Sequence, residues 1–270
     1  MPPDIEQMKE RSARLWGLGD YTRLAKLLEP AAASLVDACA VSAGQEVLDV
    51  AAGNGNFAIL AAREGAAVAA IDLAPHQVEL GRARSEAEGL SIEWVEGDAE
   101  DLPFEDERFD CVGSVFGAML TPQPPVVARE MFRVVRPGGT VGMANWTKEG
   151  FQARLFGMFA SYSPVPDELP RPSDVWGTEE LVRGHFEGLA GSLSVELASV
   201  SWEGESPEAV FDSLGSVAGP QTALKEALPP ERWEELRREA IRIIEEWASP
   251  ADGGIAVTGD YLVVVARKRG

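Results

Sequence analysis

The sequence predicts an α/β fold built on a seven-stranded, mostly parallel β-sheet, with an antiparallel last strand and helices on both faces. Short apolar runs typical of buried strands alternate with stretches of helical periodicity over roughly the first 150 residues. Residues 47–59 (VLDVAAGNGNFAI) join one such strand to a glycine turn and then to a helix. A last apolar run, residues 261–266, closes the sheet after long helical insertions.

The glycine turn is typical of a ligand site. Gly53 and Gly55 let the backbone turn tightly and lie against a ligand, where a Cβ would intrude. The helix that follows presents free N–H groups and the positive end of its dipole, and both favour an anion. Asp72 stands at the end of the next apolar run, residues 67–71, where a carboxylate can accept both hydroxyls of a ribose. The pattern therefore predicts a nucleoside-containing cofactor.

The glycines alone leave two cofactor classes open. Gly53, Gly55 and Ala58 satisfy the loose dinucleotide pattern G-x-G-x-x-A, so a nicotinamide-dependent oxidoreductase or a flavin enzyme is an alternative. Asp49, inside the strand before the turn, argues against it, because a pyrophosphate gains nothing from a nearby carboxylate. A sulfonium and an ammonium group would be stabilised by that carboxylate. In addition, no tyrosine of the sequence has a lysine four residues later, as many hydride-transferring enzymes do.

The segment Asp49-x-Ala51-x-Gly53-x-Gly55 resembles the acidic-x-G-x-G-x-G motif of class I S-adenosylmethionine (SAM) methyltransferases, with Ala51 in place of the first glycine. Further segments follow in the order of that family. They are a helix over residues 75–88, a strand ending at residues 97–100 (GDAE), a strand within residues 109–120, and a helix that ends at residues 137–139 (PGG) before a fifth strand. The order is similar to that of the ubiquinone/menaquinone-biosynthesis-type (type 11) small-molecule methyltransferases.

This resemblance implies a Rossmann-like fold, SAM as cofactor, and methyl transfer to a small, apolar or aromatic molecule. It implies that Tyr21 reaches the methionine end of SAM, although simple packing of its ring is an alternative. We expect Asp72 to hold the ribose hydroxyls, Asp98 to accept a hydrogen bond from the adenine amino group, and the backbone N–H of Ala99 to meet the adenine ring. The expected cofactor-binding residues are Tyr21, Asp49, Ala51, Gly53, Gly55, Asp72, Leu73, Asp98, Ala99 and Phe116.

The predicted acceptor pocket is dry and apolar and lies at the carboxyl ends of the strands. The positive charge of a sulfonium disperses as its methyl group is attacked, so an apolar pocket that aligns the nucleophile favours the reaction. No catalytic residue is assigned, and methyl transfer by proximity is expected to suffice. The expected pocket residues are Trp16, Met119, Trp146, Phe151, Phe156 and His185.

Charge, cysteine count and the lack of long apolar segments argue against several classes of partner. The net charge of −20 and the absence of any Lys/Arg cluster argue against a nucleic-acid substrate. Two cysteines are too few for a disulfide framework or a zinc site, and the positions after the fourth and fifth strands hold Phe116 and Asn145 rather than carboxylates, so no metal is expected. The sequence shows no long apolar segment, and we expect a cytoplasmic monomer or homodimer without a membrane partner.

The expected organisation is a single methyltransferase domain over residues 1–270. It contains an N-terminal helical lid (residues 1–40), a SAM-binding core (41–147), and helical substrate-cap insertions at residues 148–192 and 203–250. A non-catalytic SAM-binding protein that regulates or scaffolds a partner is the remaining alternative, because sequence cannot show whether the substrate entrance is blocked.

Two helix starts are marked within the cap. Thr178 precedes two glutamates and is typical of an N-cap residue. Pro229-Pro230 precede a segment whose apolar residues recur at helical spacing up to Trp247.

Overall fold

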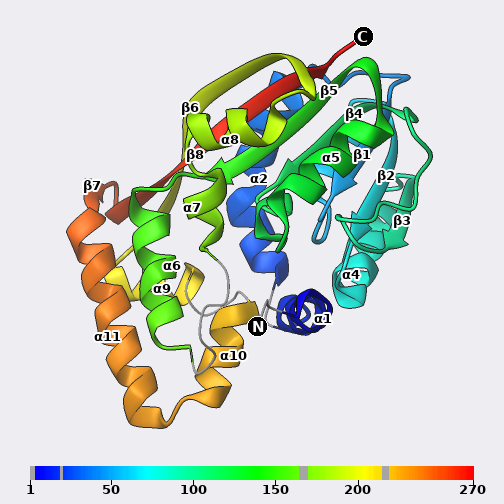
Figure 1. Ribbon diagram of the computed structural model, residues 1–270. Coiled ribbons are helices and arrows are strands. Elements are labelled where there is room, and N and C mark those ends of the chain that lie inside the picture. Colours follow the sequence, from blue (N-terminus) through cyan, green and yellow to red (C-terminus); the bar gives the residue numbers. More distant parts are fainter. Residues whose placement is uncertain (1–3, 19–20, 164–169, 215–218) are drawn as a thin grey trace.

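The computed structural model describes residues 4–18, 21–163, 170–214 and 219–270. Its strands form one mixed sheet in the order β3-β2-β1-β4-β5-β8-β6, and a short extra strand, β7, pairs with β8 (Figure 1). The seven strands of the main path match the predicted sheet. The strands are β1 Glu46–Val50, β2 Ala67–Asp72, β3 Ile92–Glu96, β4 Phe109–Val115, β5 Val135–Trp146, β6 Ala190–Gly204, β7 Ser249–Ala251 and β8 Gly254–Lys268.

The first five strands of the sheet path run parallel, and β8 pairs antiparallel with both β5 and β6. Leu48 of β1 lies opposite Ala69 of β2 on one side and Val112 of β4 on the other. All three are buried, since helices cover both faces of a parallel sheet and leave its strands almost continuously apolar. The parallel strands place the turns after β1, β2 and β4 at one common edge, where ligands bind in such sheets.

Helices lie on both faces (Figure 1). On one face, α2 (Tyr21–Ala38) packs closely on β5: a Cβ added to Gly142 would lie 3.3 Å from Cδ1 of Leu35 in this helix and 2.3 Å from Sγ of Cys39, the residue that follows it. On the other face lie α5 (Pro124–Val134) and α8 (Glu179–Phe186), which contact each other through Phe132 and Phe186, with ring centroids 5.0 Å apart. The helices α3 (Asn56–Arg63) and α4 (Pro75–Ala87) follow β1 and β2, as predicted.

The structure corrects two predicted boundaries. The helix expected to reach residues 137–139 ends at Val134, and β5 begins at once, with a register shift against β4 where these residues lie. Pro137 explains the early end, because a proline forces the preceding residue into extended backbone. The fourth strand ends at Val115 rather than running on, since Phe116 takes a left-handed φ of 59° and a 3₁₀ turn, η1 (Ala118–Leu120), follows.

The insertions form a helical cap below the sheet in Figure 1, and two predicted helix starts are confirmed. The side chain of Thr178 accepts a hydrogen bond from the N–H of Leu181, and α11 begins at Pro230. A proline-rich stretch at residues 164–172, for which the sequence predicts a loop, lies mostly outside the described residues. The cap helices are α6 Phe151–Ser161, α7 Pro172–Trp176, α9 Pro207–Leu214, α10 Gly219–Ala227 and α11 Pro230–Trp247.

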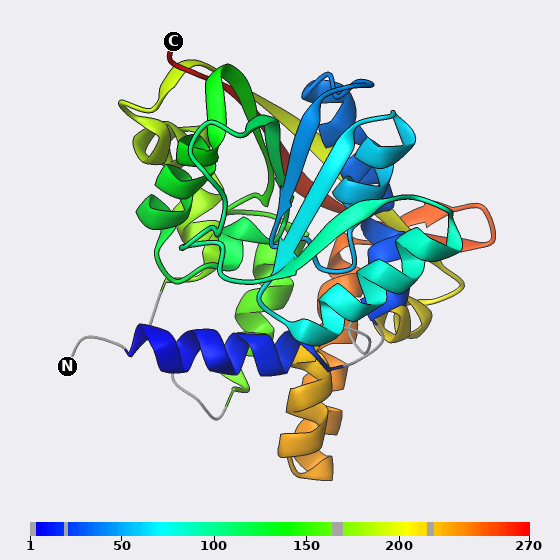
Figure 2. The ribbon, with the colours of Figure 1, turned by 90° about the vertical axis from the view of Figure 1, so that its right-hand side faces the viewer.

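The N-terminal helix α1 (Ile5–Trp16) crosses the strand-end edge of the sheet (Figure 2). One end of it meets the cap, where a Cβ added to Gly219 of α10 would lie 1.8 Å from the carbonyl oxygen of Leu15. Its last residue meets α4, where Gln77 Nε2 donates a hydrogen bond of 2.5 Å to the carbonyl oxygen of Trp16. Among the described residues, no helix is both long and apolar enough to cross a membrane.

Candidate cofactor and acceptor site

The turn between β1 and α3 has an unusual backbone. Ala51, Gly53 and Gly55 all have positive φ angles, of 52°, 56° and 85°. Glycine adopts this conformation without strain, whereas Ala51 pays a steric cost for it. The three positive φ angles turn the backbone sharply between β1 and α3. Gly55, the last of the three residues, directly precedes α3.

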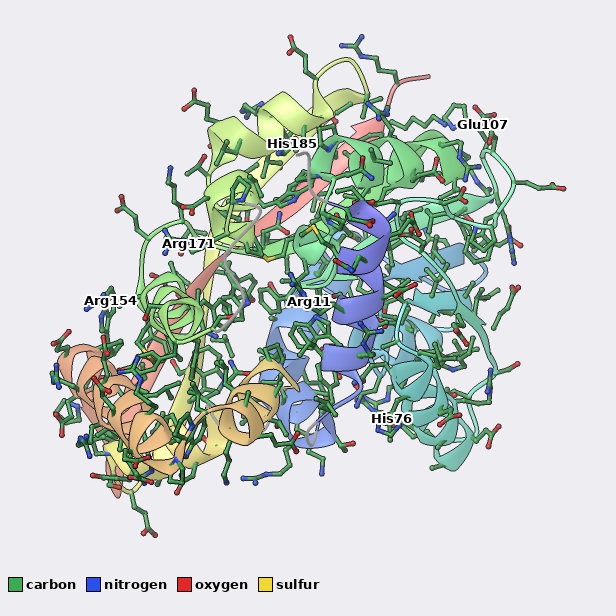
Figure 3. The ribbon with its side chains drawn as sticks, turned by 60° about the horizontal axis from the view of Figure 1, so that its bottom comes forward. Arg11, His76, Glu107, Arg154, Arg171 and His185 are labelled. Carbon is green, nitrogen blue, oxygen red and sulfur yellow. The ribbon has the colours of Figure 1, made fainter. Side chains whose placement is uncertain are left out.

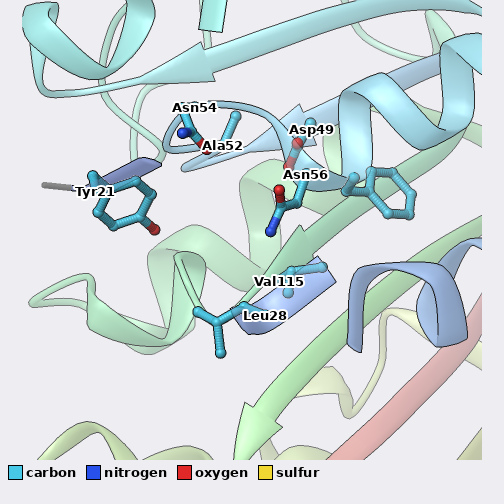
Figure 4. A pocket seen from close by; sticks show the side chains of 8 residues that line it. Tyr21, Leu28, Asp49, Ala52, Asn54, Asn56 and Val115 are labelled. Atoms are coloured by element: carbon cyan, nitrogen blue, oxygen red, sulfur yellow. The ribbon is translucent and has the colours of Figure 1, made fainter. Parts of the chain in front are cut away.

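Two carboxylates brace this turn, of which Asp49 is buried and Asp72 is half-buried. Asp49 accepts a hydrogen bond from the N–H of Ala58 at 2.9 Å, across the start of α3. Asp72, at the end of β2, accepts one from the N–H of Gly53 at 2.7 Å and another from the N–H of Ala74 at 2.9 Å. The sequence thus places an acidic residue at the end of each of two neighbouring strands, and both point into the same turn (Figure 4 shows Asp49).

Burial controls the protonation of both groups. It raises the pKa of Asp49 to about 8; the hydrogen bond from Ala58 opposes the rise and the charge of Asp72 adds to it. Burial also raises the pKa of Asp72, against the lowering effect of the N–H groups of Ala74 and Gly53. A cation bound near the turn would favour both carboxylates in their charged form.

Tyr21, the first residue of α2, lies over the turn (Figure 4). A Cβ added to Gly53 would lie 2.8 Å from Cε1 of Tyr21. The cavity beside them measures only about 10 Å³ and is lined by Tyr21, Leu28, Asp49, Ala52, Asn54, Asn56, Phe57 and Val115. Such a volume holds about one water molecule. In this conformation Tyr21 covers Gly53, so a ligand could lie directly against that glycine only after the ring moved.

Gly55 has a packing role beside the cofactor role expected of it. A Cβ there would lie 2.5 Å from Cη2 of Trp94, a side chain of β3 that also packs against Gly81 of α4. The missing side chain at Gly55 therefore makes room for protein packing. A larger residue at this position would disturb the fold as well as the site, whereas at Gly53 the first neighbour is the movable ring of Tyr21.

The turn after β3 contains a contact that sequence reasoning missed. Asp98 accepts a hydrogen bond from the N–H of Glu100 through Oδ1, and its Oδ2 lies 2.6 Å from Nζ of Lys9 on α1. The same Nζ lies 2.8 Å from Glu100, whose side chain is almost fully buried. One lysine thus forms ion pairs with two neighbouring carboxylates and connects α1 to the turn. Nothing in the helical pattern around Lys9 distinguishes it from a solvent-exposed lysine.

Five aromatic side chains form a connected cluster at the carboxyl ends of β4 and β5. The ring of Phe116 stacks on Trp146 with centroids 3.9 Å apart and planes within 3°. Tyr261 of β8 meets both rings edge-on, and Trp202 of β6 lies 6.0 Å from Trp146. Phe151 of α6 completes the cluster at 6.1 Å from Trp202. We call these residues the aromatic cluster.

The cluster brings together three predicted residues and two that were not predicted. Trp146 and Phe151 were expected to line the acceptor pocket, and Phe116 was expected to bind the cofactor. Tyr261 and Trp202 were assigned only to strands, because the sequence does not indicate how far the last strands extend toward the site. Gly117 connects the cluster to the turn, since a Cβ there would lie 2.2 Å from the carbonyl oxygen of Ala51.

The other predicted pocket residues are more widely spread. Met119 is buried in η1, and the ring of Trp16 meets Tyr21 edge-on at 6.1 Å. Phe156 on α6 is 37% exposed. The Nε2 of His185 lies 2.9 Å from the carbonyl oxygen of Val175, and its ring packs on Trp176, so that α7 and α8 hold it (Figure 3). Among the expected cofactor residues, Ala99 is buried and Leu73 is half-buried.

Asn145 lies beside the cluster but on the opposite face of β5. Alternation along the strand puts Trp146 on the same face as Gly142, which touches α2, and Asn145 on the other. Asn145 is fully buried, and neither atom of its amide has a hydrogen-bond partner among the described residues.

Comparison with known proteins agrees with this geometry. A family model described as a methyltransferase domain matches residues 47–139. An uncharacterized protein of Mycobacterium bovis is 35% identical over 260 residues, covering 94% of this chain and 93% of the relative. The demethylmenaquinone methyltransferase of Clavibacter sepedonicus is 39% identical over 110 residues, or 41% of this chain and 44% of that protein. The crystal structure of a putative methyltransferase from Bacillus halodurans shares the fold, with a TM-score of 0.60, 23% identity, and coverage of 88% of this chain and 99% of that one.

The fold and the braced glycine turn define a nucleoside-binding α/β enzyme. The chain belongs to the class I SAM-dependent methyltransferases, as its resemblance to the quinone-biosynthesis type implied. SAM is its cofactor, and the expected Rossmann-like fold is confirmed.

Proposed function

We propose that this methyltransferase acts on a small, apolar or aromatic molecule bound against the aromatic cluster. The observation that carries the proposal is the stacked pair of Phe116, which directly follows β4, and Trp146, which is the last residue of β5. Both side chains are buried, and flat apolar surfaces of this kind suit a flat apolar ligand.

The residues at the turn fit SAM. Asp49 offers a carboxylate to the cationic end of the cofactor, and Asp72 offers oxygen atoms to hydroxyl groups. Asp98 would accept a hydrogen bond from the adenine amino group. Lys9 competes for this contact, because its Nζ pairs with Oδ2 of Asp98 in the ligand-free structure. Gly53 allows close approach of the ligand once Tyr21 has moved.

When bound, SAM supplies an electrophilic methyl group on a sulfonium. The chain contributes orientation and exclusion of water: the aromatic cluster presents the acceptor, and Tyr21 and α1 cover the site. The five residues of the aromatic cluster include no carboxylate, histidine or lysine that could take a proton from the acceptor. The proposal is therefore transfer to an acceptor that is already nucleophilic.

The experiment is a methyl-transfer assay that quantifies S-adenosylhomocysteine, with a panel of phenols, aromatic amines and charged aliphatic amines. We expect transfer to members of the first two classes, and a KM raised about tenfold or more in Trp146→Ala, because burial of a large ring contributes more than 1.4 kcal/mol. The half-buried Trp233, which packs on Phe211 rather than on a ring of the aromatic cluster, is the matched control, and its replacement by alanine should leave KM unchanged. Transfer only to charged aliphatic amines would contradict the proposal. SAM binding without transfer to any acceptor would favour a non-catalytic role.

We also propose that α1 and Tyr21 act as the lid predicted for residues 1–40, over a core spanning residues 41–147. The nearly filled cavity supports this, because the cofactor cannot enter while Tyr21 covers Gly53. Lys9 supports it too, since a single ammonium group holds α1 to Asp98 and Glu100. Residues 148–192 and 203–250 remain a proposed substrate cap.

Replacing Lys9 with methionine should free α1 from the turn. We expect faster hydrogen exchange in Ile5–Trp16 of the ligand-free protein, with no change in α11. Arg14→Met is the matched control, because Arg14 forms only an exposed pair with Glu10 on the same helix. In wild-type protein, SAM with a bound acceptor should slow exchange in α1 more than in α11. Equal exchange of α1 in Lys9→Met and wild type, or no protection by ligands, would contradict the lid.

The remaining predictions concern partners. The net charge of −20 supports a small-molecule acceptor over a nucleic acid, whose binding needs a basic surface. A cytoplasmic location and a monomeric or homodimeric state are likewise proposals, and sedimentation of the purified chain tests the latter.

A further inference from the structure

The strand β6 (Ala190–Gly204) forms one edge of the sheet (Figure 1). It pairs with β8 along almost its whole length, and its other side meets no strand of the described residues. None of the residues 190–199 is buried. An edge of this kind presents a row of unpaired N–H and C=O groups, to which a further strand can bind.

The two edges of the sheet differ in how they resist such pairing. Short length, charged side chains and proline are what usually keep an edge strand from binding another strand. At the opposite edge, β3 has only five residues, and two of them are glutamates. In contrast, β6 has fifteen residues without lysine or proline, and Glu196 is the one charged residue between Ala190 and Trp202. The composition of β6 therefore favours a partner strand.

The exposed edge has an apolar side chain at its midpoint. Leu197 is 68% exposed, which is the highest value among the exposed large hydrophobic residues of the described part of the chain. Seven residues of β6 precede Leu197 and seven follow it. A single exposed leucine on a protein surface is ordinary, but this one lies at the centre of a long unpaired edge.

The central position of Leu197 suits pairing with a second copy of the same strand. Two copies of one strand pair antiparallel about a twofold axis, and each residue then contacts the same surface of the other copy. An axis at Leu197 places the two leucines directly opposite, where apolar cross-strand pairs stabilise a sheet. Glu203 and Gly191 each lie six residues from the axis, so the partner's Glu203 lies opposite Gly191.

Arginine side chains lie at the Gly191 end of β6. A Cβ added to Gly191 would lie 3.5 Å from Cγ of Arg269. Arg269 and Arg183 line a hollow of about 480 Å³ beside the start of β6, together with one glutamate, Glu187. Arg183 is already paired within α8, whereas Nε of Arg269 donates to a backbone carbonyl oxygen rather than to a carboxylate. Glu203 is exposed at the far end of the strand. Each copy thus offers a glutamate where the other offers an arginine.

We propose that two copies of this chain pair through β6, antiparallel about a twofold axis at Leu197, and form one continuous sheet across a homodimer. The inference selects the homodimer from the two proposed states and does not depend on the identity of the methyl acceptor. The reciprocal placement of Glu203 and Arg269 favours a second copy over an unrelated partner strand, which would not repeat that exchange of charges.

Sedimentation equilibrium of Leu197→Lys is the first test, because two ammonium groups would then lie opposite each other at the axis. We expect the wild type to be a dimer at micromolar concentration, and the variant to dissociate at least tenfold more readily with an unchanged far-ultraviolet circular dichroism spectrum. Leu120→Lys is the matched control, since Leu120 is also exposed but lies on η1, and its dimer should match the wild type. A monomeric wild type, or equal dissociation constants for the two variants, would overturn the proposal.

Leu197→Cys locates the axis. Residues directly opposite in an antiparallel pair have Cα atoms about 4.5–5.5 Å apart, within the range that a disulfide spans. An added oxidant should therefore convert this variant to a covalent dimer on a non-reducing gel. Ser201→Cys is the control, because it is exposed on the same strand but its two copies lie roughly 26 Å apart along the paired strands. The native Cys39 and Cys111 are buried and should not react. Equally fast crosslinking of Ser201→Cys, or none of Leu197→Cys, would show that the axis is elsewhere.

Exchanging the charges tests the register independently. Glu203→Arg or Arg269→Glu alone places like charges together at both ends of the interface, and each should raise the dissociation constant about tenfold. The double variant restores opposite charges at both ends and should dimerise as the wild type does. A double variant that is weaker than either single variant would contradict the pairing of Glu203 with Arg269.

Discussion

Replacing Asp72 with alanine is expected to weaken SAM binding by about 3 kcal/mol, which is roughly a 100-fold loss of affinity. Hydrogen bonds to a charged group contribute about 1.5–3 kcal/mol each, and a ribose offers two hydroxyls to this carboxylate. The effect is enlarged because Asp72 also accepts the hydrogen bond from Gly53 that holds the glycine turn. Calorimetric titration of the variant with SAM measures the loss directly.

Two further variants separate binding from folding. Asp72→Asn keeps an oxygen acceptor for Gly53 while removing the charge, so the turn is preserved and SAM binding should still weaken. Asp101→Ala removes a carboxylate that is exposed near the same edge of the sheet, and it should bind SAM as wild type does. An affinity within twofold of wild type in a folded Asp72→Ala protein would show that the ribose contact is assigned to the wrong residue.

The second large effect concerns Asp49 and pH. Burial raises the pKa of Asp49 to about 8, from an ordinary value of 3.8. Because the folded protein favours the neutral acid, the stability that Asp49 contributes is complete below pH 3.8 and is lost as the pH rises through about 8. Between about pH 5 and pH 8 the loss is on the order of 3 kcal/mol.

Asp49→Asn should remove this dependence while keeping an oxygen acceptor for the N–H of Ala58. Urea denaturation at the two pH values measures it. We expect the variant to exceed wild type in free energy of unfolding by a larger margin at the higher pH. Asp101→Asn, an exposed control, should follow the wild-type curve. Parallel curves for Asp49→Asn and wild type would mean that Asp49 is charged in the folded protein throughout this range.

The same protonation is coupled to the cofactor. A cation bound beside Asp49 favours the carboxylate, so SAM binding should release a proton below about pH 8 and tighten as the pH rises toward that value. The negative charge of Asp49 thus lowers the stability of the free enzyme and favours cofactor binding.

The central part of the fold could be predicted because its signals are local. A strand, a positive-φ turn and a helix follow one another within residues 47–59, and Asp72 ends the next strand. Each of these features depends on neighbours in the chain, so a short window of sequence contains all of its causes.

The contacts that complete the site depend on long-range packing. Lys9 meets Asp98 across 89 positions of the chain, and Trp202 of β6 lies near Trp146 of β5 only because β8 pairs with both of these strands. Helical periodicity predicted α1 but not that its single lysine, Lys9, would contact the turn after β3. His185 was expected to face the pocket, and a one-turn helix, α7, presents a carbonyl to its ring instead.

The most direct test of the central claim is calorimetric titration of the wild-type chain and of Asp72→Ala with SAM at about pH 8, with NADPH titrated in parallel. The structure predicts saturable binding of one SAM per chain, a roughly 100-fold loss in the variant, and no binding of NADPH. Tighter binding of NADPH than of SAM, or equal SAM affinity in the two proteins, would contradict the assignment of the glycine turn and Asp72 as the SAM site.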